Sequence, residues 1–348
     1  MTLGTAFSSP DLSEATSDST KTLRIFNGFL ALLVFLPLCH LYSFTADKHH
    51  MKLLLILLII IAGGYDDPAL ISKLERKVSD NPGDWRSCLE LAEVFIEQEN
   101  FKEAKKYLMQ AQESYKTGKI DTCSARYFYI LGLYNDYNVN VPVAINYYSK
   151  AIECDSTFSD AWRNQGYLYE IFGNYNQMLN CFKHALLSTD DSAGVYYDLG
   201  VTYDYLDSIE LALESYYHAL KLGGSSPRVF LNIGVDWGFT GYVDSAAHYF
   251  EKAKQAGLRS PELFYNIGVI MSELGAYDEA MDNFMKALAV DPDYSPAKLQ
   301  LGNIYEIKGD SGMAKVYFEE FVQTAPPIYM DDVKKIEAKL VKYNKAPK

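Results

Sequence analysis

Apolar and small residues recur along most of the chain at a fixed spacing of 34 positions. Glycine occupies one position of this pattern in six successive copies, at Gly132, Gly166, Gly200, Gly234, Gly268 and Gly302. An alanine or methionine follows twelve residues after each glycine, and an aromatic residue follows four residues later. A period of this length is typical of arrays in which each copy is one supersecondary unit.

Within each copy the apolar positions fall three or four residues apart, which predicts two amphipathic helices. The glycine and alanine positions are small because two helix backbones approach closely there, and the aromatic residue fills the space between copies. Serine followed by proline at Ser226, Ser260 and Ser295 predicts an N-cap and the first turn of a helix. We therefore expect each copy to be a pair of antiparallel helices.

An earlier copy fits the same pattern from residue 85, but it is offset by 40 residues. This offset predicts about six inserted residues between Gly118 and Ser124. We expect seven units, at residues 85–118, 125–158, 159–192, 193–226, 227–260, 261–294 and 295–328. Residues 65–84 are predicted to form half a unit, and residues 329–348 a capping helix.

The spacing resembles that of the tetratricopeptide repeat (TPR) family, which has a small residue, an alanine, an aromatic residue and another alanine at these positions. The resemblance covers residues 85–328, with departures at Ala92, Gln165, Met178 and Phe321. It implies an all-α fold: a right-handed superhelical α-solenoid of about seven helix-turn-helix units with a C-terminal capping helix.

The resemblance also implies a binding surface, because in this family the first helices line a concave groove that holds peptides or other proteins. The candidate protein-binding residues on that basis are Tyr129, Arg163, Asn164, Tyr167, Tyr197, Asp198, Asn232, Tyr265, Asn266 and Gln300. A primary amide both donates and accepts hydrogen bonds, so a row of asparagines pairs with an extended peptide backbone. The alternatives are that the asparagines are simply polar surface residues and that the tyrosines pack between neighbouring helices.

The composition narrows the range of partners. A net charge of −13 and a pI near 5.0 argue against a nucleic-acid partner, which requires clustered Lys and Arg. The lysines that form a clamp around two carboxylates in chaperone-binding members of the family are also missing from the equivalent positions. A protein or peptide partner of another kind is therefore expected.

The sequence gives little support for a catalytic site or a metal site. His184 and His218 occupy an outward-facing position of successive units. Ligands of one metal ion lie about 2 Å from it, whereas packed helices lie about 10 Å apart. No phosphate-binding loop, nucleophile elbow or zinc spacing is present in the sequence. We expect no catalytic residue, no metal and no cofactor.

The N-terminal region contains two apolar stretches. Residues 26–44 are long enough, at about 1.5 Å per residue, to reach across a hydrocarbon core of about 30 Å. Residues 51–64 begin with Met51 and Lys52, continue through an apolar run and end in small residues, as a signal peptide does. Either Met51 is the true start and residues 1–50 are upstream sequence, or residues 26–44 are a membrane anchor. Both interpretations predict an exported (periplasmic or extracellular) or membrane-tethered array.

Two cysteines bear on this localisation. Cys123 precedes the first helix of its unit and Cys154 ends the second, so an antiparallel pair brings them together. They are a candidate disulfide of an exported protein.

Two functions remain open at this stage. The first is a non-catalytic scaffold that holds a partner segment in the groove. The second is a regulatory or assembly subunit of an enzyme complex whose catalytic site lies on another chain.

Overall fold

The protein is all-helical in the computed structural model, which describes residues 67–345. Sixteen α-helices and one short 3-10 helix are present in that part of the chain. The α-helices are α3 (Pro68–Asp80), α4 (Trp85–Glu97), α5 (Phe101–Lys116), α6 (Ala125–Tyr137), α7 (Val141–Cys154), α8 (Ser159–Ile171), α9 (Tyr175–Ala185), α10 (Ser192–Tyr205), α11 (Ile209–Lys221), α12 (Pro227–Phe239), α13 (Val243–Gln255), α14 (Pro261–Glu273), α15 (Tyr277–Val290), α16 (Ser295–Ile307), α17 (Ser311–Thr324) and α18 (Met330–Lys345). The 3-10 helix η3 (Pro327–Tyr329) precedes α18.

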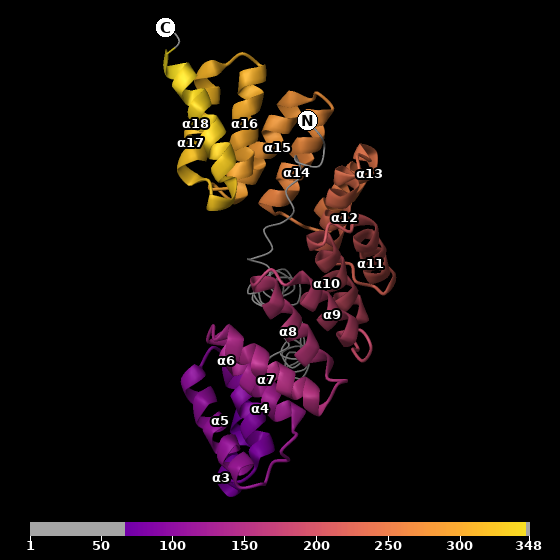
Figure 1. Cartoon of the computed structure of the whole chain (residues 1–348), viewed down its shortest axis with the longest axis vertical. Helices are drawn as coiled ribbons and strands as arrows, with labels where there is room; N and C mark the ends of the chain where they lie inside the picture. The colour runs from indigo at the N-terminus through magenta and orange to yellow at the C-terminus, as the bar shows by residue number, and fades with distance from the viewer. Residues whose placement is uncertain (1–66, 346–348) are drawn as a thin grey trace, which may run out of the picture. The chain divides into compact units, whose positions relative to one another are not determined.

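Helices α4 to α17 form seven consecutive pairs, and three residues separate the two helices of each pair. Such short connections join antiparallel neighbours, and the pairs are visible in Figure 1. The predicted all-α array of helix-turn-helix units is confirmed. The eight residues between α5 and α6 accommodate the insertion expected from the sequence offset.

Six of the seven pairs, from α6/α7 to α16/α17, have a close contact between a glycine and an aromatic residue sixteen positions later. A Cβ added to Gly132 would lie 2.5 Å from the ring of Tyr148, and one added to Gly268 would lie 2.7 Å from that of Phe284. Real Cβ atoms do not approach other atoms this closely, so only glycine fits. The aromatic rings are themselves fully buried: Tyr148, Phe182, Tyr216, Phe250, Phe284 and Phe318.

The described chain also divides into two larger compact parts, each made of several helix pairs, which we call the first unit and the second unit. The first unit runs to Asp191 and contains α3–α9; its core includes Leu91, Ile96 and Tyr148. The second unit begins at Ser192 and contains α10–α18; Phe250 and Phe284 lie at its core.

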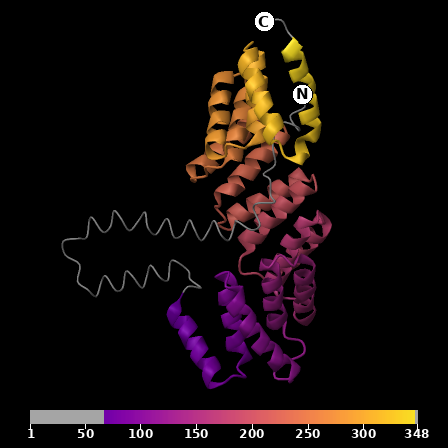
Figure 2. The same cartoon turned by 90° about the vertical axis from the view of Figure 1, so that its left-hand side faces the viewer.

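The flanking helices cover the ends of the array. Leu74 and Val78 of α3 are buried, whereas Leu70, expected on the same face, is 37% exposed. Helix α18 lies beside α17 in both views (Figures 1 and 2) and buries Ile336 in a cluster with Phe321. Phe321, which departs from the repeat pattern, thus packs against the capping helix and not against a further helix pair.

The predicted serine caps are only partly observed. Ser260 caps α14, where its hydroxyl accepts a hydrogen bond of 3.3 Å from the amide of Leu263. Ser226 stands at the N-cap of α12 without a side-chain bond. Ser295 is instead the first residue of α16, and its hydroxyl has two carbonyl acceptors within reach, those of Asp293 at 3.2 Å and Thr324 at 3.3 Å.

The membrane anchor and signal-peptide predictions fall on residues 1–64, outside the described part of the chain. No helix within residues 67–345 is both long enough and apolar enough to cross a bilayer.

Candidate protein-binding surface

The first helices of the pairs carry the predicted binding residues. In the first unit, Arg163 of α8 is 21% exposed and pairs with Asp191 at 3.1 Å. The second nitrogen of its guanidinium donates to the hydroxyl of Tyr167, also at 3.1 Å. This arrangement holds a half-buried arginine and tyrosine one helical turn apart, with part of each facing solvent.

Asn164, next to Arg163, belongs to a network between helix pairs. Its amide donates to the hydroxyls of Tyr129 and Tyr148, each at 3.4 Å, and Tyr148 donates to Asp136 at 3.2 Å. Burial raises the pKa of Asp136 to about 6, and the hydrogen bond from Tyr148 opposes that shift. The amide of Asn164 is therefore already engaged by protein groups.

An ion pair that the sequence patterns did not indicate links α4 to α6 in the first unit. The Arg126 guanidinium pairs with Glu93 and lies 5.6 Å from the ring centroid of Tyr129. The pKa of Glu93 is raised overall, because the effect of burial exceeds the lowering by the charge of Arg126. The two residues lie 33 positions apart, so a search for opposite charges about one period apart would have found them.

The second unit repeats the tyrosine–asparagine contact. Asn232 of α12 donates to the hydroxyl of Tyr216 at 3.0 Å, and that hydroxyl donates to Asp204. Asn232 is 3% exposed. Its amide therefore packs between two helix pairs.

The structure corrects the expectation that the position-matched residues face solvent. Tyr129, Asp198, Tyr265 and Asn266 are buried in addition to Asn232. The physical reason is packing: the ring of Tyr265, for example, lies 5.6 Å from that of Phe284 and 5.7 Å from that of Tyr294. The row of asparagines is thus largely an internal feature of the array.

Asn266 differs from the other two asparagines. It is fully buried, and neither its Oδ1 nor its Nδ2 has a hydrogen-bond partner within the described residues. Tyr197 and Gln300, by contrast, are half-buried. Of the ten predicted residues, Arg163, Asn164, Tyr167, Tyr197 and Gln300 retain exposed surface.

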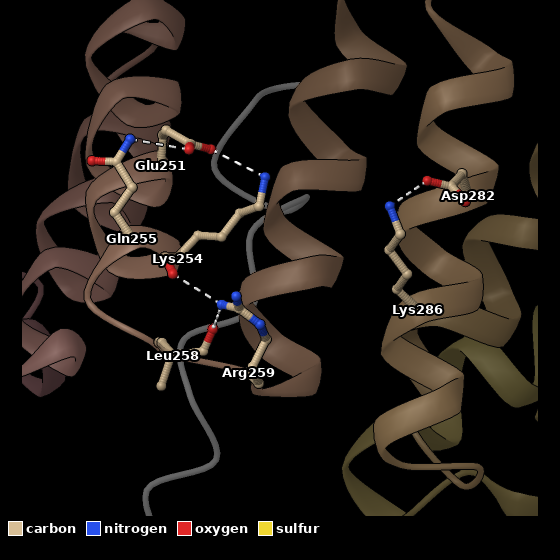
Figure 3. Close-up of polar contacts among 7 residues, drawn as sticks. All are labelled: Glu251, Lys254, Gln255, Leu258, Arg259, Asp282 and Lys286. Atoms are coloured by element: carbon tan, nitrogen blue, oxygen red, sulfur yellow. Dashed lines mark hydrogen bonds and ion pairs between the residues drawn. The ribbon is translucent and has the colours of Figure 1, made fainter. Parts of the chain in front are cut away.

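Ordinary polar contacts lie on the surfaces of the second helices α13 and α15. Figure 3 shows Glu251 bonded to Lys254 and Gln255 on α13, and Asp282 paired with Lys286 on α15. Arg259 donates to the carbonyls of Lys254 and Leu258, where α13 ends. Exposed pairs of this kind contribute about 0.3–0.5 kcal/mol each. They give this surface no feature that selects a ligand.

The two histidines at the outward-facing repeat position lie over aromatic rings. His184 stacks on Trp162 with centroids 4.5 Å apart, and His218 stacks on Tyr196 at 4.9 Å. Nowhere in residues 67–345 do three or more His, Cys, Asp or Glu side chains gather where they would hold a metal ion.

Cys123 and Cys154 are joined by a disulfide, with their Cα atoms 5.0 Å apart. The bond connects the loop before α6 to the end of α7, across one helix pair. Cys88 and Cys181 are buried free thiols, and burial raises their pKa values to about 11 and about 12.

Comparison with known proteins agrees with this architecture. Models of the tetratricopeptide repeat match residues 86–117, 147–180, 193–222, 261–294 and 295–327. The chain belongs to the tetratricopeptide repeat family. A curated relative, the uncharacterized protein MJ0572 of Methanocaldococcus jannaschii, is 34% identical over 62 residues, which cover 18% of this chain and 72% of the relative.

Several solved structures share the fold. A tetratricopeptide repeat protein from Parabacteroides merdae has a TM-score of 0.57 at 15% identity, over 75% of this chain and 99% of that one. The APC/C hetero-tetramer Cut9-Hcn1 gives 0.56 at 18% identity, over 76% of this chain. This TPR chain spans only about half (52%) of the matched chain of that complex. PilW, a type IV pilus biogenesis factor, gives 0.54 at 17% identity, over 61% and 97% of the two chains.

Proposed function

We propose that this TPR protein is a non-catalytic scaffold that binds a segment of another protein along its first helices. TPR proteins as a family bind protein partners, and the finer proposal concerns where the partner lies. The observation that carries it is the bonded pair of Arg163 and Tyr167 on α8, which combines charge and aromatic surface with partial exposure. Arginine and tyrosine are the residue types in which protein interfaces are enriched.

The geometry favours a partner that extends the existing hydrogen bonds. Arg163 is anchored by Asp191 and Tyr167, so little side-chain entropy is lost when it contacts a partner. Its guanidinium can donate hydrogen bonds to carboxylates or backbone carbonyls of a partner. The net charge of −13 leaves the remainder of the surface better suited to a partner with basic flanking residues.

A second candidate is a regulatory or assembly subunit of an enzyme complex, with catalysis on another chain. Affinity purification separates the two: a single enzyme recovered at fixed stoichiometry favours the second candidate. The alternative shares the same binding surface, so both predict that α8 is required.

The binding surface is tested by the double variant Arg163→Ala/Tyr167→Ala, with Asp282→Ala/Lys286→Ala on α15 as a matched control. Both variants remove two polar side chains from an α-helix, but only the first alters the proposed surface. A partner recovered by the wild type and the control, and lost by the first variant, supports the proposal. Equal recovery by all three contradicts it.

We also propose that the array functions outside the cytoplasm or tethered to a membrane. The disulfide between Cys123 and Cys154 supports this, since such bonds persist mainly in oxidising compartments. Mass spectrometry of the mature N-terminus tests it. A chain that begins near Gly64 indicates export with cleavage, peptides from residues 1–50 indicate an uncleaved segment, and a cytoplasmic chain with reduced Cys123 and Cys154 contradicts the proposal.

A further inference from the structure

Two buried carboxyl groups meet between α10 and α12 in the second unit. The carboxyl groups of Asp204 and Asp236 are direct neighbours, each has one buried oxygen that receives no hydrogen bond, and Asp236 is 3% exposed. An ionised carboxylate is only an acceptor. A hydrogen bond between two carboxyl groups therefore requires that one of them carries a proton.

The surrounding hydrogen bonds support the same conclusion. If both groups were ionised, Oδ1 of Asp204 and Oδ2 of Asp236 would be buried acceptors with no donor in the described structure. Tyr216 donates to Oδ2 of Asp204, and Asn232 holds the Tyr216 hydroxyl in place. Asp204 thus has a donor that stabilises its carboxylate, and Asp236 is the group better suited to hold the proton.

No cation compensates the pair. Among the described residues, no Lys, Arg or His forms an ion pair with either carboxyl group, and the groups that act on them are Tyr216 and each other. The other titratable groups on the helices around the pair are Tyr196, Tyr197, Asp198, Tyr203 and Tyr205 on α10, Glu210, Glu214, Tyr217, His218 and Lys221 on α11, Arg228 on α12, Asp244, His248, Tyr249, Glu251, Lys252 and Lys254 on α13, and Glu262, Tyr265 and Glu273 on α14. The positive charge of Arg228 lowers the pKa of Tyr197, against the larger rise caused by burial.

We propose that Asp204 and Asp236 are a shared-proton pair that couples the stability of the second unit to pH around neutrality. The unit takes up this proton when it folds and releases it when α10 and α12 separate. The pair contacts Tyr216, whose ring lies 5.9 Å from that of half-exposed Tyr197. A further consequence, which rests on the proposed function, is a lower affinity for the protein partner at alkaline pH.

The direction of the effect follows from the two protonation states. Burial raises the pKa of both carboxyls, and the neighbouring carboxylate raises that of Asp236 further. The folded state therefore holds more protons than the unfolded state above the ordinary aspartate value of about 3.9. Stability falls as pH rises through this window, and each extra proton bound in the folded state makes the unfolding constant rise about tenfold per pH unit.

The test is urea unfolding of the full chain at pH 6, 7, 8 and 9, followed by hydrogen exchange of peptides from α10–α12. We compare the wild type with Asp236→Asn, whose amide donates to Asp204 without a titrating proton. Asp207→Asn is the matched control, because it removes the same charge at an exposed position three residues from Asp204. The expected result is a steep rise of the unfolding constant with pH in the wild type and the control, and a flatter one in Asp236→Asn. Parallel slopes in all three overturn the proposal.

A second measurement covers the case in which Asp236→Asn does not fold. NMR of the side-chain carboxyl carbons in the wild type reports the titration of Asp204 and Asp236 directly. The proposal requires at least one of them to stay protonated at pH 7, and titration of both below pH 5 overturns it. Neither experiment contains a partner, so its outcome is independent of whether the protein-binding surface has been correctly assigned.

Discussion

The amide of Asn232 donates a hydrogen bond of 3.0 Å to the hydroxyl of Tyr216, which lies in the preceding helix pair. Asn164 and Tyr148 make the same contact in the first unit, at 3.4 Å. In both cases the tyrosine hydroxyl donates in turn to an aspartate of its own pair. The third asparagine at this position, Asn266, follows Phe250 by the same sixteen residues and has no hydroxyl to contact.

This difference predicts opposite effects of adding and removing a hydroxyl. Tyr216→Phe leaves the buried amide of Asn232 without its partner and is expected to reduce the free energy of unfolding by about 1–3 kcal/mol. Phe250→Tyr offers Asn266 a partner and is expected to increase it by about 1 kcal/mol. Urea unfolding measures both. Stabilisation by Tyr216→Phe would show that the contact is not favourable.

The glycine–aromatic contact predicts a large penalty for one methyl group. Gly268→Ala forces the ring of Phe284 to move and is expected to cost about 1–3 kcal/mol, despite the better helix propensity of alanine. Gly312→Ala in α17 is the control, since the nearest atom to an added Cβ there lies 3.4 Å away. We expect that control to be neutral or stabilising by up to about 1 kcal/mol. Thermal unfolding followed by circular dichroism would compare them, and equal effects would contradict the packing argument.

The disulfide is predicted to stabilise the first unit. It closes a loop of 31 residues, for which chain entropy gives about 3–4 kcal/mol. The double variant Cys123→Ser/Cys154→Ser is expected to lose about this amount under non-reducing conditions. Under reducing conditions the wild type should approach the variant. Peptide mapping without reductant is the accompanying control. Recovery of both cysteines as free thiols would contradict the prediction.

Asp136 predicts a second pH dependence, at lower pH than that of the shared-proton pair. Burial raises its pKa to about 6, above the ordinary value of about 3.9, so the folded state gains a proton within this range. Its contribution to stability is therefore largest below about pH 4 and is lost as pH rises to about 6, a change of about 2–3 kcal/mol. The difference in unfolding free energy between the wild type and Asp136→Asn, measured from pH 4 to 7, should follow this curve. A constant difference would contradict it.

The array could be predicted from the sequence because its main constraint is local. A glycine and an aromatic ring sixteen residues apart lie in the same helix pair, so a repeated spacing of Gly132 and Tyr148 already specifies their contact. The helix boundaries follow from the same spacing. The extra helices α3 and α18 were indicated by single apolar faces.

The binding surface was less predictable, since helical periodicity does not distinguish a position that faces a partner from one that faces the next helix pair. Asn164 and Asn232 occupy equivalent positions, yet Asn232 is 3% exposed and Asn164 is half-buried. Local packing determines this difference. The contact between Asp204 and Asp236 joins two helices 32 residues apart in sequence and became apparent only in three dimensions.

The tyrosine–asparagine contact also limits how this array can be rearranged by duplication or by protein engineering. A 34-residue cassette carries its own glycine–aromatic contact, and by that criterion any copy can be moved anywhere. A cassette that contains Tyr216, however, leaves a hydroxyl that accepts its hydrogen bond from an asparagine in the cassette after it. Residues 193–226 can therefore be followed by residues 227–260 but not by a second copy of themselves, because Asp198 takes that position and a carboxylate cannot donate a hydrogen bond. The order of the copies is thus part of what the sequence encodes.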